Sequence, residues 1–181
     1  MLASAVVRGR KNPLFLGFAS RLRRARKAEG LTRFGVTTMT TAKDRELVAS
    51  LEAGHRIPRL DTVEKLAFAL GVSPAFLAYG LDGAPDSSCD TLRALGVAAR
   101  LRMTRIDQGL SVLAVATAAG ISHTAVGNIE RGTVPGLDTT EALATALGVS
   151  PGWLAYGIGP MESPRRRAVR AAQAQPSAST S

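Results

Sequence analysis

The sequence of 181 residues is poor in the residue types that build catalytic and metal centres. It has one cysteine, Cys89, so no disulfide can form within the chain and no zinc site can be built from cysteines. The two histidines, His55 and His123, are far apart in the sequence and have no acidic cluster near them. Aromatic residues make up only 4% of the chain, which argues against an aromatic ligand pocket or a base-stacking platform. We therefore expect no enzymatic activity, no cofactor, no metal and no small-molecule ligand.

The sequence also contains no uninterrupted apolar run of the length, about 18 residues, that a membrane-spanning helix needs. We therefore expect no membrane partner and a cytoplasmic location. The composition is ordinary for a folded chain, with 45% hydrophobic and 20% charged residues.

Positive charge is abundant and concentrated near the ends of the chain. The net charge is +9, and residues 1–30 alone carry eight Lys or Arg against one Glu. Residues 160–181 add four Arg against one Glu. Such an excess predicts binding to a polyanion, either nucleic acid or an anionic surface.

An internal repeat determines the predicted organisation. Residues 60–80 read LDTVEKLAFALGVSPAFLAYG, residues 137–157 read LDTTEALATALGVSPGWLAYG, and 16 of these 21 positions are identical. Upstream, RLRRARKAEGLT at 21–32 matches RLRMTRIDQGLS at 100–111. Two matching blocks in the same order indicate a duplicated unit. The predicted segments are a basic N-terminal arm over 1–16, a first unit over 17–81, a linker over 82–95, a second unit over 96–158 and a disordered basic tail over 159–181.

The second unit is predicted to form five short helices. Serine N-caps, glycines after the helix ends and a proline at a first helical position mark the boundaries. The expected helices are one that has Val97 and Leu101 on its buried face and ends at Gly109, one over Val112–Ala119 capped by Ser111 and closed by Gly120, one from the cap Ser122 to about Arg131, one from Asp138 or Thr139 to Leu147, and one opened by Ser150 and Pro151. A short turn between the second and third helices is typical of a helix-turn-helix.

The residues that carry this pattern resemble the Cro/cI (XRE-like) helix-turn-helix repressor family. They are RLRRARKAEGLT in the first unit, and AGISHTAVGNIERGTVP and LATALGVSPGWLAYG in the second. The resemblance implies an all-α fold of two lambda-repressor-like five-helix domains in tandem, with disordered basic termini. It also implies a transcription regulator that binds double-stranded DNA through the third helix of each unit. A bacterial or phage-encoded protein associated with the nucleoid is what this resemblance implies about location.

Each unit departs from the family pattern in one place. In the first unit, TRFGVTTMTTAKDRELVASLEAG has one extra residue, lacks the turn glycine and carries several threonines. In the second unit, the helix VLAVATAA is almost wholly apolar. Relatives place Gln, which contacts the DNA backbone, where this chain has Val112 and, in the first unit, Arg33.

The resemblance assigns a role to three groups of residues. Base-reading positions on the third helices are Ser122, His123, Thr124 and Asn128 in the second unit and Arg45, Glu46 and Ser50 in the first. In this assignment Asn128 is suited to an adenine edge, Arg45 to guanine and Glu46 to cytosine. Phosphate contacts are expected from Thr32, Arg33, Arg56, Arg59, Ser111, Arg131 and Thr133. Structural ion pairs are expected between Arg26 and Glu52 and between Arg105 and Glu130.

Three further expectations concern Gly127, the charge of the two units and an alternative function. Gly127, in the middle of the third helix, indicates a close approach either to a phosphate backbone or to another helix. The first unit, with 11 basic and six acidic residues over 18–81, is expected to supply affinity, while the second supplies more of the sequence reading. The alternative function is a protein-interaction or dimerisation module in which one unit has lost DNA binding and Val112 or Val115 faces another copy or a different protein.

Overall fold

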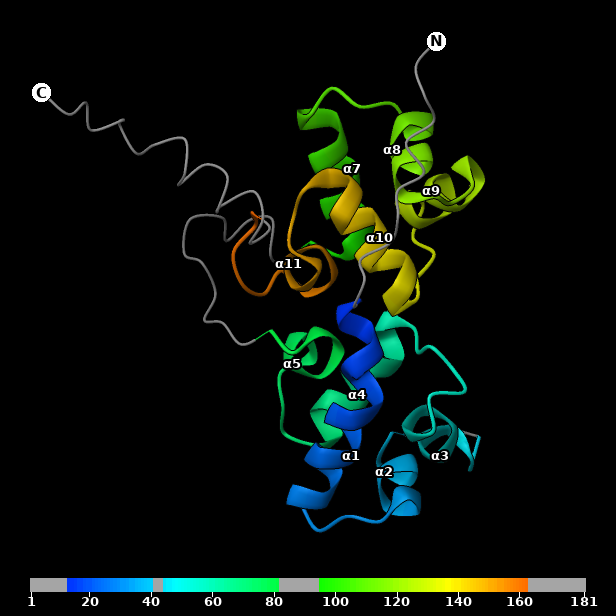
Figure 1. Ribbon diagram of the computed structural model, residues 1–181, viewed down its shortest axis with the longest axis vertical. Coiled ribbons are helices and arrows are strands. Elements are labelled where there is room, and N and C mark those ends of the chain that lie inside the picture. The colour runs from blue at the N-terminus through cyan, green and yellow to red at the C-terminus, as the bar shows by residue number, and fades with distance from the viewer. Residues whose placement is uncertain (1–12, 41–43, 82–94, 163–181) are drawn as a thin grey trace, which may run out of the picture.

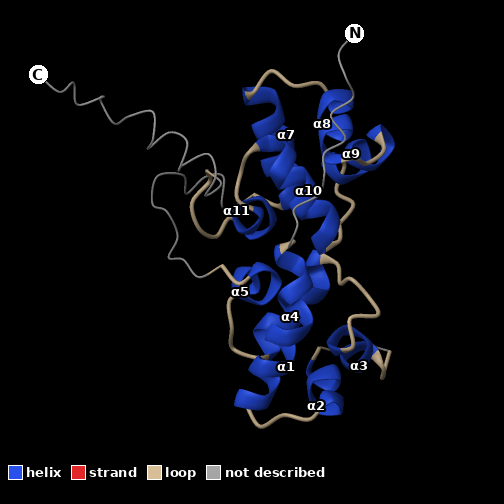
Figure 2. Ribbon diagram, in the orientation of Figure 1, coloured by secondary structure: helices blue, strands red, loops and turns tan. Residues whose placement is uncertain are grey.

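The computed structural model describes residues 13–40, 44–81 and 95–162, and within these ranges the chain is helical (Figure 2). The elements are η1 (Leu14–Gly17), α1 (Phe18–Ala28), α2 (Arg33–Met39), α3 (Leu47–Glu52), α4 (Leu60–Ala69), α5 (Pro74–Tyr79), α7 (Val97–Asp107), α8 (Val112–Ala119), α9 (His123–Glu130), α10 (Leu137–Leu147) and α11 (Pro151–Tyr156). The predicted all-α fold is confirmed. We refer to η1 through α5 as the N-terminal half and to α7 through α11 as the C-terminal half (Figure 1).

The outer parts of the predicted segments fall outside the described residues. This applies to residues 1–12 of the predicted arm, to the predicted linker except Leu95, and to residues 163–181 of the predicted tail. Among the described residues, no single helix is long and apolar enough to cross a membrane. The pair α8 and α9 passes on combined length and composition, but the chain bends by 116° between them.

Local signals in the sequence set the helix boundaries of the C-terminal half. Ser111 caps α8 by accepting a hydrogen bond from the Ala114 N–H at 3.1 Å, and Gly120 closes the helix in the left-handed conformation with φ 69°. A helix end of this kind favours glycine because the positive φ strains other residues. The predicted bounds of α8 are therefore confirmed, and α10 begins at Leu137, one residue before the predicted start.

Each half has its own hydrophobic core. Leu22, Leu51, Leu66 and Tyr79 belong to the core of the N-terminal half. The corresponding cluster of the C-terminal half includes Leu101, Val126 and Leu143. Two buried residues of the C-terminal half belong to the core of the N-terminal half: Leu137, the first residue of α10, and Ala155 of α11. The two cores therefore share a boundary at the start of α10 and at α11.

The two halves meet through reciprocal backbone contacts. The Leu60 N–H donates to the Pro135 carbonyl at 3.1 Å, and the Leu137 N–H donates to the Pro58 carbonyl at 3.2 Å. Arg59 and Gly136 lie between them as an antiparallel bridge. Residues 58–60 and 135–137 are equivalent in the sequence repeat, so each segment makes to the other the contacts that it receives. Reciprocity of this kind characterises the isologous interface of a twofold dimer.

Helix packing extends this reciprocal contact. α5 packs against α11, its counterpart in the repeat, and the two lie together on one side of the molecule (Figure 1). The α2–α3 and α8–α9 pairs lie on the other side, towards opposite ends of the molecule (Figure 1). The third helices of both halves are consequently presented on the same side.

The folded part of the chain is longer than predicted at both ends. Residues 14–16, assigned from the sequence to the basic arm, belong to η1 (Leu14–Gly17), which packs against α5 and α10. Its Leu14 and Phe15 N–H groups donate to the carboxylate of Glu141 at 2.9 and 3.1 Å. At the other end, the Ser150 N–H donates to the Met161 carbonyl at 2.9 Å. These contacts depend on partners distant in sequence, which local composition does not reveal.

Two equivalent arginines fasten the first helix of each half to its fifth helix. Arg21 Nε donates to the Leu77 carbonyl of α5, and Arg100 Nε donates to the Leu154 carbonyl of α11, both at 2.9 Å. A cation is favourable at the carbonyl end of a helix. Burial lowers the pKa of Arg100 to about 10, although the charge of Glu64 opposes this shift. Both arginines therefore have a structural role.

The two equivalent tyrosines at the interface make different hydrogen bonds. The Tyr79 hydroxyl donates to the Leu137 carbonyl at 3.2 Å, across the boundary between the halves. The buried Tyr156 hydroxyl has no hydrogen-bond partner among the described residues.

We predict that Tyr79→Phe lowers the free energy of unfolding by about 1 kcal/mol, the usual net value of such a bond. Tyr156→Phe should leave it unchanged or raise it, because no described bond is lost.

Urea unfolding of the two variants, monitored by circular dichroism, measures this difference. Each variant is the control for the other because both lose one hydroxyl from a buried ring. Equal losses of stability in the two variants would contradict the finding that only Tyr79 of this pair makes a hydrogen bond across the interface.

Candidate nucleic-acid interface

The helix-turn-helix of the C-terminal half consists of α8, the turn at Gly120 and α9. Val126 and Ile129 anchor α9 in the core, at 0% and 4% exposure. This arrangement leaves His123, Thr124 and Asn128 exposed on the outer face of α9. The structure thus brings these three predicted base-reading residues together on one surface, on the first and second turns of a helix.

Ser122 occupies the N-cap position of α9. Its hydroxyl oxygen accepts a hydrogen bond from the Ala125 N–H at 3.1 Å. This bond satisfies one of the free N–H groups at the start of the helix. Ser122 therefore has a structural role in the described state, and His123 is the first residue of the helix itself.

Asn128 is paired with another predicted contact residue. The Arg131 guanidinium, just after the end of α9, donates from Nη2 to the Asn128 Oδ1 at 2.5 Å. Gly127 lies beside this pair, and the three atoms nearest to a Cβ added there all belong to the Arg131 guanidinium, at 3.4 Å or more. The nearest neighbour of Gly127 is thus the Arg131 side chain rather than another helix, and the expected approach to a phosphate backbone stays a prediction.

The corresponding segment of the N-terminal half has a different local structure. α3 begins only at Leu47, so Arg45 and Glu46 lie in the turn before the helix, with Glu46 as its N-cap residue. The prediction that these two residues lie on the third helix is wrong. The Asp44 carboxylate accepts a hydrogen bond from the Glu46 N–H at 3.0 Å, which stabilises a turn in place of a first helical turn.

Asp44 is also tied to the loop that follows α3. It forms an ion pair with Arg56, with 2.5 Å between Nη1 and Oδ2. Hydrogen bonds from Arg56 and from the Glu46 N–H lower the pKa of Asp44. The Arg56 charge, predicted to contact phosphate, is therefore shared with a carboxylate in the described state. Ser50 on α3 is turned to its own helix, since its hydroxyl donates to the Leu47 carbonyl at 2.9 Å.

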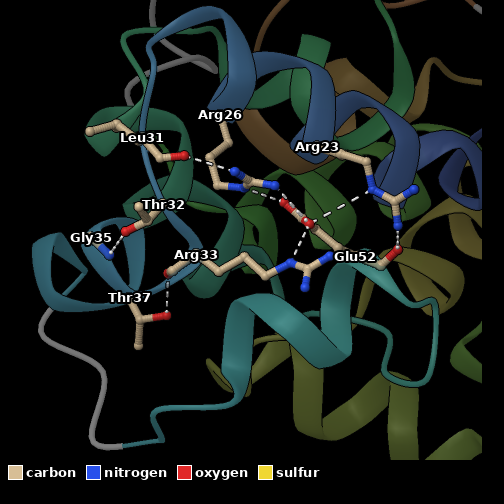
Figure 3. Close-up of polar contacts among 8 residues, drawn as sticks. All are labelled: Arg23, Arg26, Leu31, Thr32, Arg33, Gly35, Thr37 and Glu52. Atoms are coloured by element: carbon tan, nitrogen blue, oxygen red, sulfur yellow. Dashed lines mark hydrogen bonds and ion pairs between the residues drawn. The ribbon is translucent and has the colours of Figure 1, made fainter.

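A fully buried carboxylate joins the first three helices of the N-terminal half (Figure 3). Arg26 Nε of α1 lies 2.6 Å from Glu52 Oε1, and Arg33 Nε of α2 lies 2.9 Å from Oε2. Arg23 adds a longer contact of 3.8 Å and donates to the Glu52 backbone carbonyl at 3.0 Å. Burial alone disfavours the charged form of Glu52, but the hydrogen bonds from Arg26 and Arg33 outweigh it and lower its pKa.

Arg33 differs in part from its predicted role. The sequence places it among the phosphate contacts, whereas its Nε faces the buried Glu52 (Figure 3). Its side chain is still 54% exposed, so the rest of the guanidinium lies at the surface. The sequence offered no local signal for this contact, because Arg33 and Glu52 are 19 positions apart and on different helices.

The equivalent pair in the C-terminal half is simpler. Arg105 donates to both oxygens of Glu130, from Nε at 2.6 Å and from Nη2 at 3.0 Å. Val112 stands at the position that corresponds to Arg33, so it can supply no second cation. Both halves therefore contain the expected Arg–Glu pair between the first and third helices, but only the N-terminal half encloses the carboxylate with three arginines.

The other predicted phosphate contacts lie at several separate places. Thr32 caps α2 by accepting from the Gly35 N–H at 3.0 Å, as Ser111 does for α8. Thr133 is exposed in the loop after α9. Arg59 lies at the contact between the halves, where its Nε donates to the Val134 carbonyl at 3.2 Å. Arg59 is therefore removed from the α3 surface.

The apolar helix α8 exposes a different residue from Val112 and Val115, which the sequence suggested as contacts for a protein partner. Val115 is 1% exposed and belongs to the core, so its predicted presentation to a partner is wrong. Leu113 is 64% exposed instead, and its counterpart in the N-terminal half, Phe34, is 61% exposed. No group of three or more His, Cys, Asp or Glu side chains that could hold a metal ion occurs among the described residues.

Comparison with known proteins agrees with the geometry of the C-terminal half. A family model described as a helix-turn-helix matches residues 101–154, which include all of α8 and α9. No solved structure matches the chain. The family match supports a helix-turn-helix of the Cro/cI (XRE-like) type, and with it a DNA-binding transcription regulator.

The buried carboxylate leads to a prediction about stability. Glu52→Gln should lower the free energy of unfolding at neutral pH by about 3–5 kcal/mol, the usual effect of breaking a buried ion pair. The folded state holds the pKa of Glu52 below its ordinary value, so its charge contributes fully above about pH 4.5. That contribution is lost as the pH falls through the lower pKa of the folded state.

Urea unfolding at pH 7 and at pH 3 compares the wild type with Glu52→Gln. The difference in stability should be large at pH 7 and smaller at pH 3. Glu130→Gln is the matched comparison and should cost less at pH 7, because Glu130 has one arginine partner instead of three. A wild-type advantage over Glu52→Gln that is the same at both pH values would exclude the proposed charge effect.

Proposed function

We propose that the chain is a sequence-specific regulator of transcription that reads double-stranded DNA with the outer face of α9. The observation that carries this proposal is the exposed row His123, Thr124 and Asn128, held on a helix-turn-helix whose inner face is buried. His and Thr can donate to or accept from base edges in the major groove, and a threonine methyl can pack on thymine. The net charge of +9 favours the approach of DNA.

We further propose that the N-terminal half is a second unit of the same kind, which makes the chain a tandem protein. Three features support this: the repeated sequence blocks, the same succession of five helices, and the equivalent Arg26–Glu52 and Arg105–Glu130 pairs. The turn before α3 differs from the start of α9, so Arg45 and Glu46 would contact DNA from a loop. The two units would therefore prefer different base sequences.

The contact between the halves supports an arrangement for the two readers. Reciprocal contacts relate the halves as the subunits of a twofold dimer are related. Helix-turn-helix dimers read half-sites that are inverted and lie about 34 Å apart, one turn of the duplex. By the same geometry, one copy of this chain would read two inverted half-sites of unlike sequence.

The distribution of charge indicates how DNA affinity and sequence reading are divided between the two halves. The N-terminal half has the basic surplus, which favours sequence-independent contacts to phosphate. The C-terminal half is close to neutral over 97–158 and presents the regular recognition helix. We propose that the first supplies more affinity and the second more of the sequence reading.

A second candidate function is a protein-interaction module, favoured by one observation. Phe34 and Leu113, equivalent residues near the starts of α2 and α8, are both more than 60% exposed. Exposed apolar side chains at equivalent positions could bind another copy or a different protein. Under this alternative, one or both units would lack sequence-specific DNA binding.

Selection of the purified chain against a random duplex pool at about 150 mM salt, which weakens nonspecific contacts, tests the proposed function. We expect enrichment of two unlike, inverted half-sites about one turn apart. His123→Ala should change the base preference in one half-site and Arg45→Ala in the other, so each variant controls for the other.

Other outcomes each contradict a particular part of the proposal. Enrichment of one half-site alone would remove the N-terminal half as a reader. Two identical half-sites would indicate a dimer that uses one unit of each chain. No enrichment at all would exclude sequence-specific regulation and favour the interaction module.

A further inference from the structure

We propose that Asn128 and Arg131 act as one reading unit and select guanine, rather than adenine, at the base pair beneath Asn128. This inference rests on the proposed function, since it requires that α9 enters the major groove. It differs from the expectation that an isolated asparagine reads adenine. The reason is the hydrogen bond that joins the two side chains.

The orientation of the Asn128 amide follows from the nature of its partner. Arg131 Nη2 lies 2.5 Å from Asn128 Oδ1, and both residues are exposed. A guanidinium group can only donate hydrogen bonds, so the amide oxygen, not the amide nitrogen, must face it. The NH₂ group of Asn128 is then the part of the amide directed away from Arg131.

The Arg131 side chain folds back along α9, past Gly127, to reach Asn128. Residues three apart on a helix lie on the same side, so Arg131 can fold back over the last turn of α9 towards Asn128. The atom nearest to a Cβ added at Gly127 would be Arg131 Nη1, at 3.4 Å. The guanidinium therefore passes over the backbone of residue 127. A Cβ at this distance would make an ordinary van der Waals contact, so the Asn128–Arg131 pair does not depend on glycine at position 127.

The paired side chains offer the DNA a set of donors. Adenine shows an acceptor and a donor in the major groove, so its bidentate reader needs an acceptor as well as a donor. In Asn128 one lone pair of that acceptor is bound to Arg131, and the guanidinium, which can only donate, lies directly beside the oxygen. Guanine shows two acceptors, N7 and O6, which match the Asn128 NH₂ and the remaining N–H groups of Arg131. The pair is therefore complementary to guanine.

The N-terminal half has no equivalent of the Asn128–Arg131 pair. Ser50 stands at the position of Asn128, Ala53 at that of Arg131 and Ala49 at that of Gly127. No side chain there can reproduce the contact. A change in Arg131 should consequently affect the half-site read by α9 and leave the other half-site as it is, which provides a control within each experiment.

The test is selection from a random duplex pool with the wild type and with Arg131→Met, which keeps a long side chain but removes every N–H donor. In the wild type we expect guanine at one position of the α9 half-site, preferred over adenine by about 5- to 150-fold, as for a good bidentate contact. In Arg131→Met the preferred base at that position should change to adenine, because the Asn128 oxygen is released. Circular dichroism checks that the variant is folded.

Three results would overturn the inference. Adenine at that position with the wild type would show that the pair does not persist on DNA, although sequence-specific binding itself would stand. An equal loss of affinity of Arg131→Met for all sequences, with guanine still preferred, would make Arg131 a phosphate contact. No enriched sequence with the wild type would remove the proposed function together with this inference.

Discussion

The reciprocal hydrogen bonds between residues 58–60 and 135–137 are the constraint on which the arrangement of the two halves depends. Pro58 and Pro135 have no N–H group, but each offers its carbonyl to the first residue of the other half's fourth helix. Because equivalent segments bind each other, the remaining contacts, such as α5 on α11, are reciprocal as well. This contact places α3 and α9 on the same side of the molecule (Figure 1). Without the contacts between the halves, the α2–α3 and α8–α9 segments would have no fixed relative orientation.

The equivalent positions do not carry equivalent chemistry. Glu52 is enclosed by three arginines, whereas Glu130 pairs with Arg105 alone. Asn128 on α9 pairs with Arg131, the residue directly after that helix, and α3 has no equivalent pair. In the proposed two-headed reader, the common fold sets the position of both heads while these differences set what each head recognises. A duplicated chain can vary one head without changing the other, which a dimer of identical subunits cannot do.

The features that could be predicted from the sequence are those that neighbouring residues determine. The bounds of α8 follow from Ser111 and Gly120, because caps and left-handed glycines act within one helical turn. The predictions that were wrong concern features that depend on contacts between distant segments. The short α3, with Arg45 and Glu46 in the preceding turn, reflects the bonds that Asp44 makes to Glu46 and Arg56. The contact of Arg33 with Glu52 joins two helices and depends on burial that no local pattern encodes. The Arg131–Asn128 pair could have been predicted, since the spacing of three residues that brings them together is visible in the sequence.

The most direct test of the central claim, that one chain carries both halves of a DNA reader, is the stoichiometry of its complex with a selected duplex. Sedimentation equilibrium of the full chain mixed with that duplex gives the mass of the complex. The proposed arrangement predicts one chain per duplex, even with the chain in excess, because both half-sites are occupied by the same molecule. Two chains on one duplex would contradict it, since each chain would then contribute a single reading head.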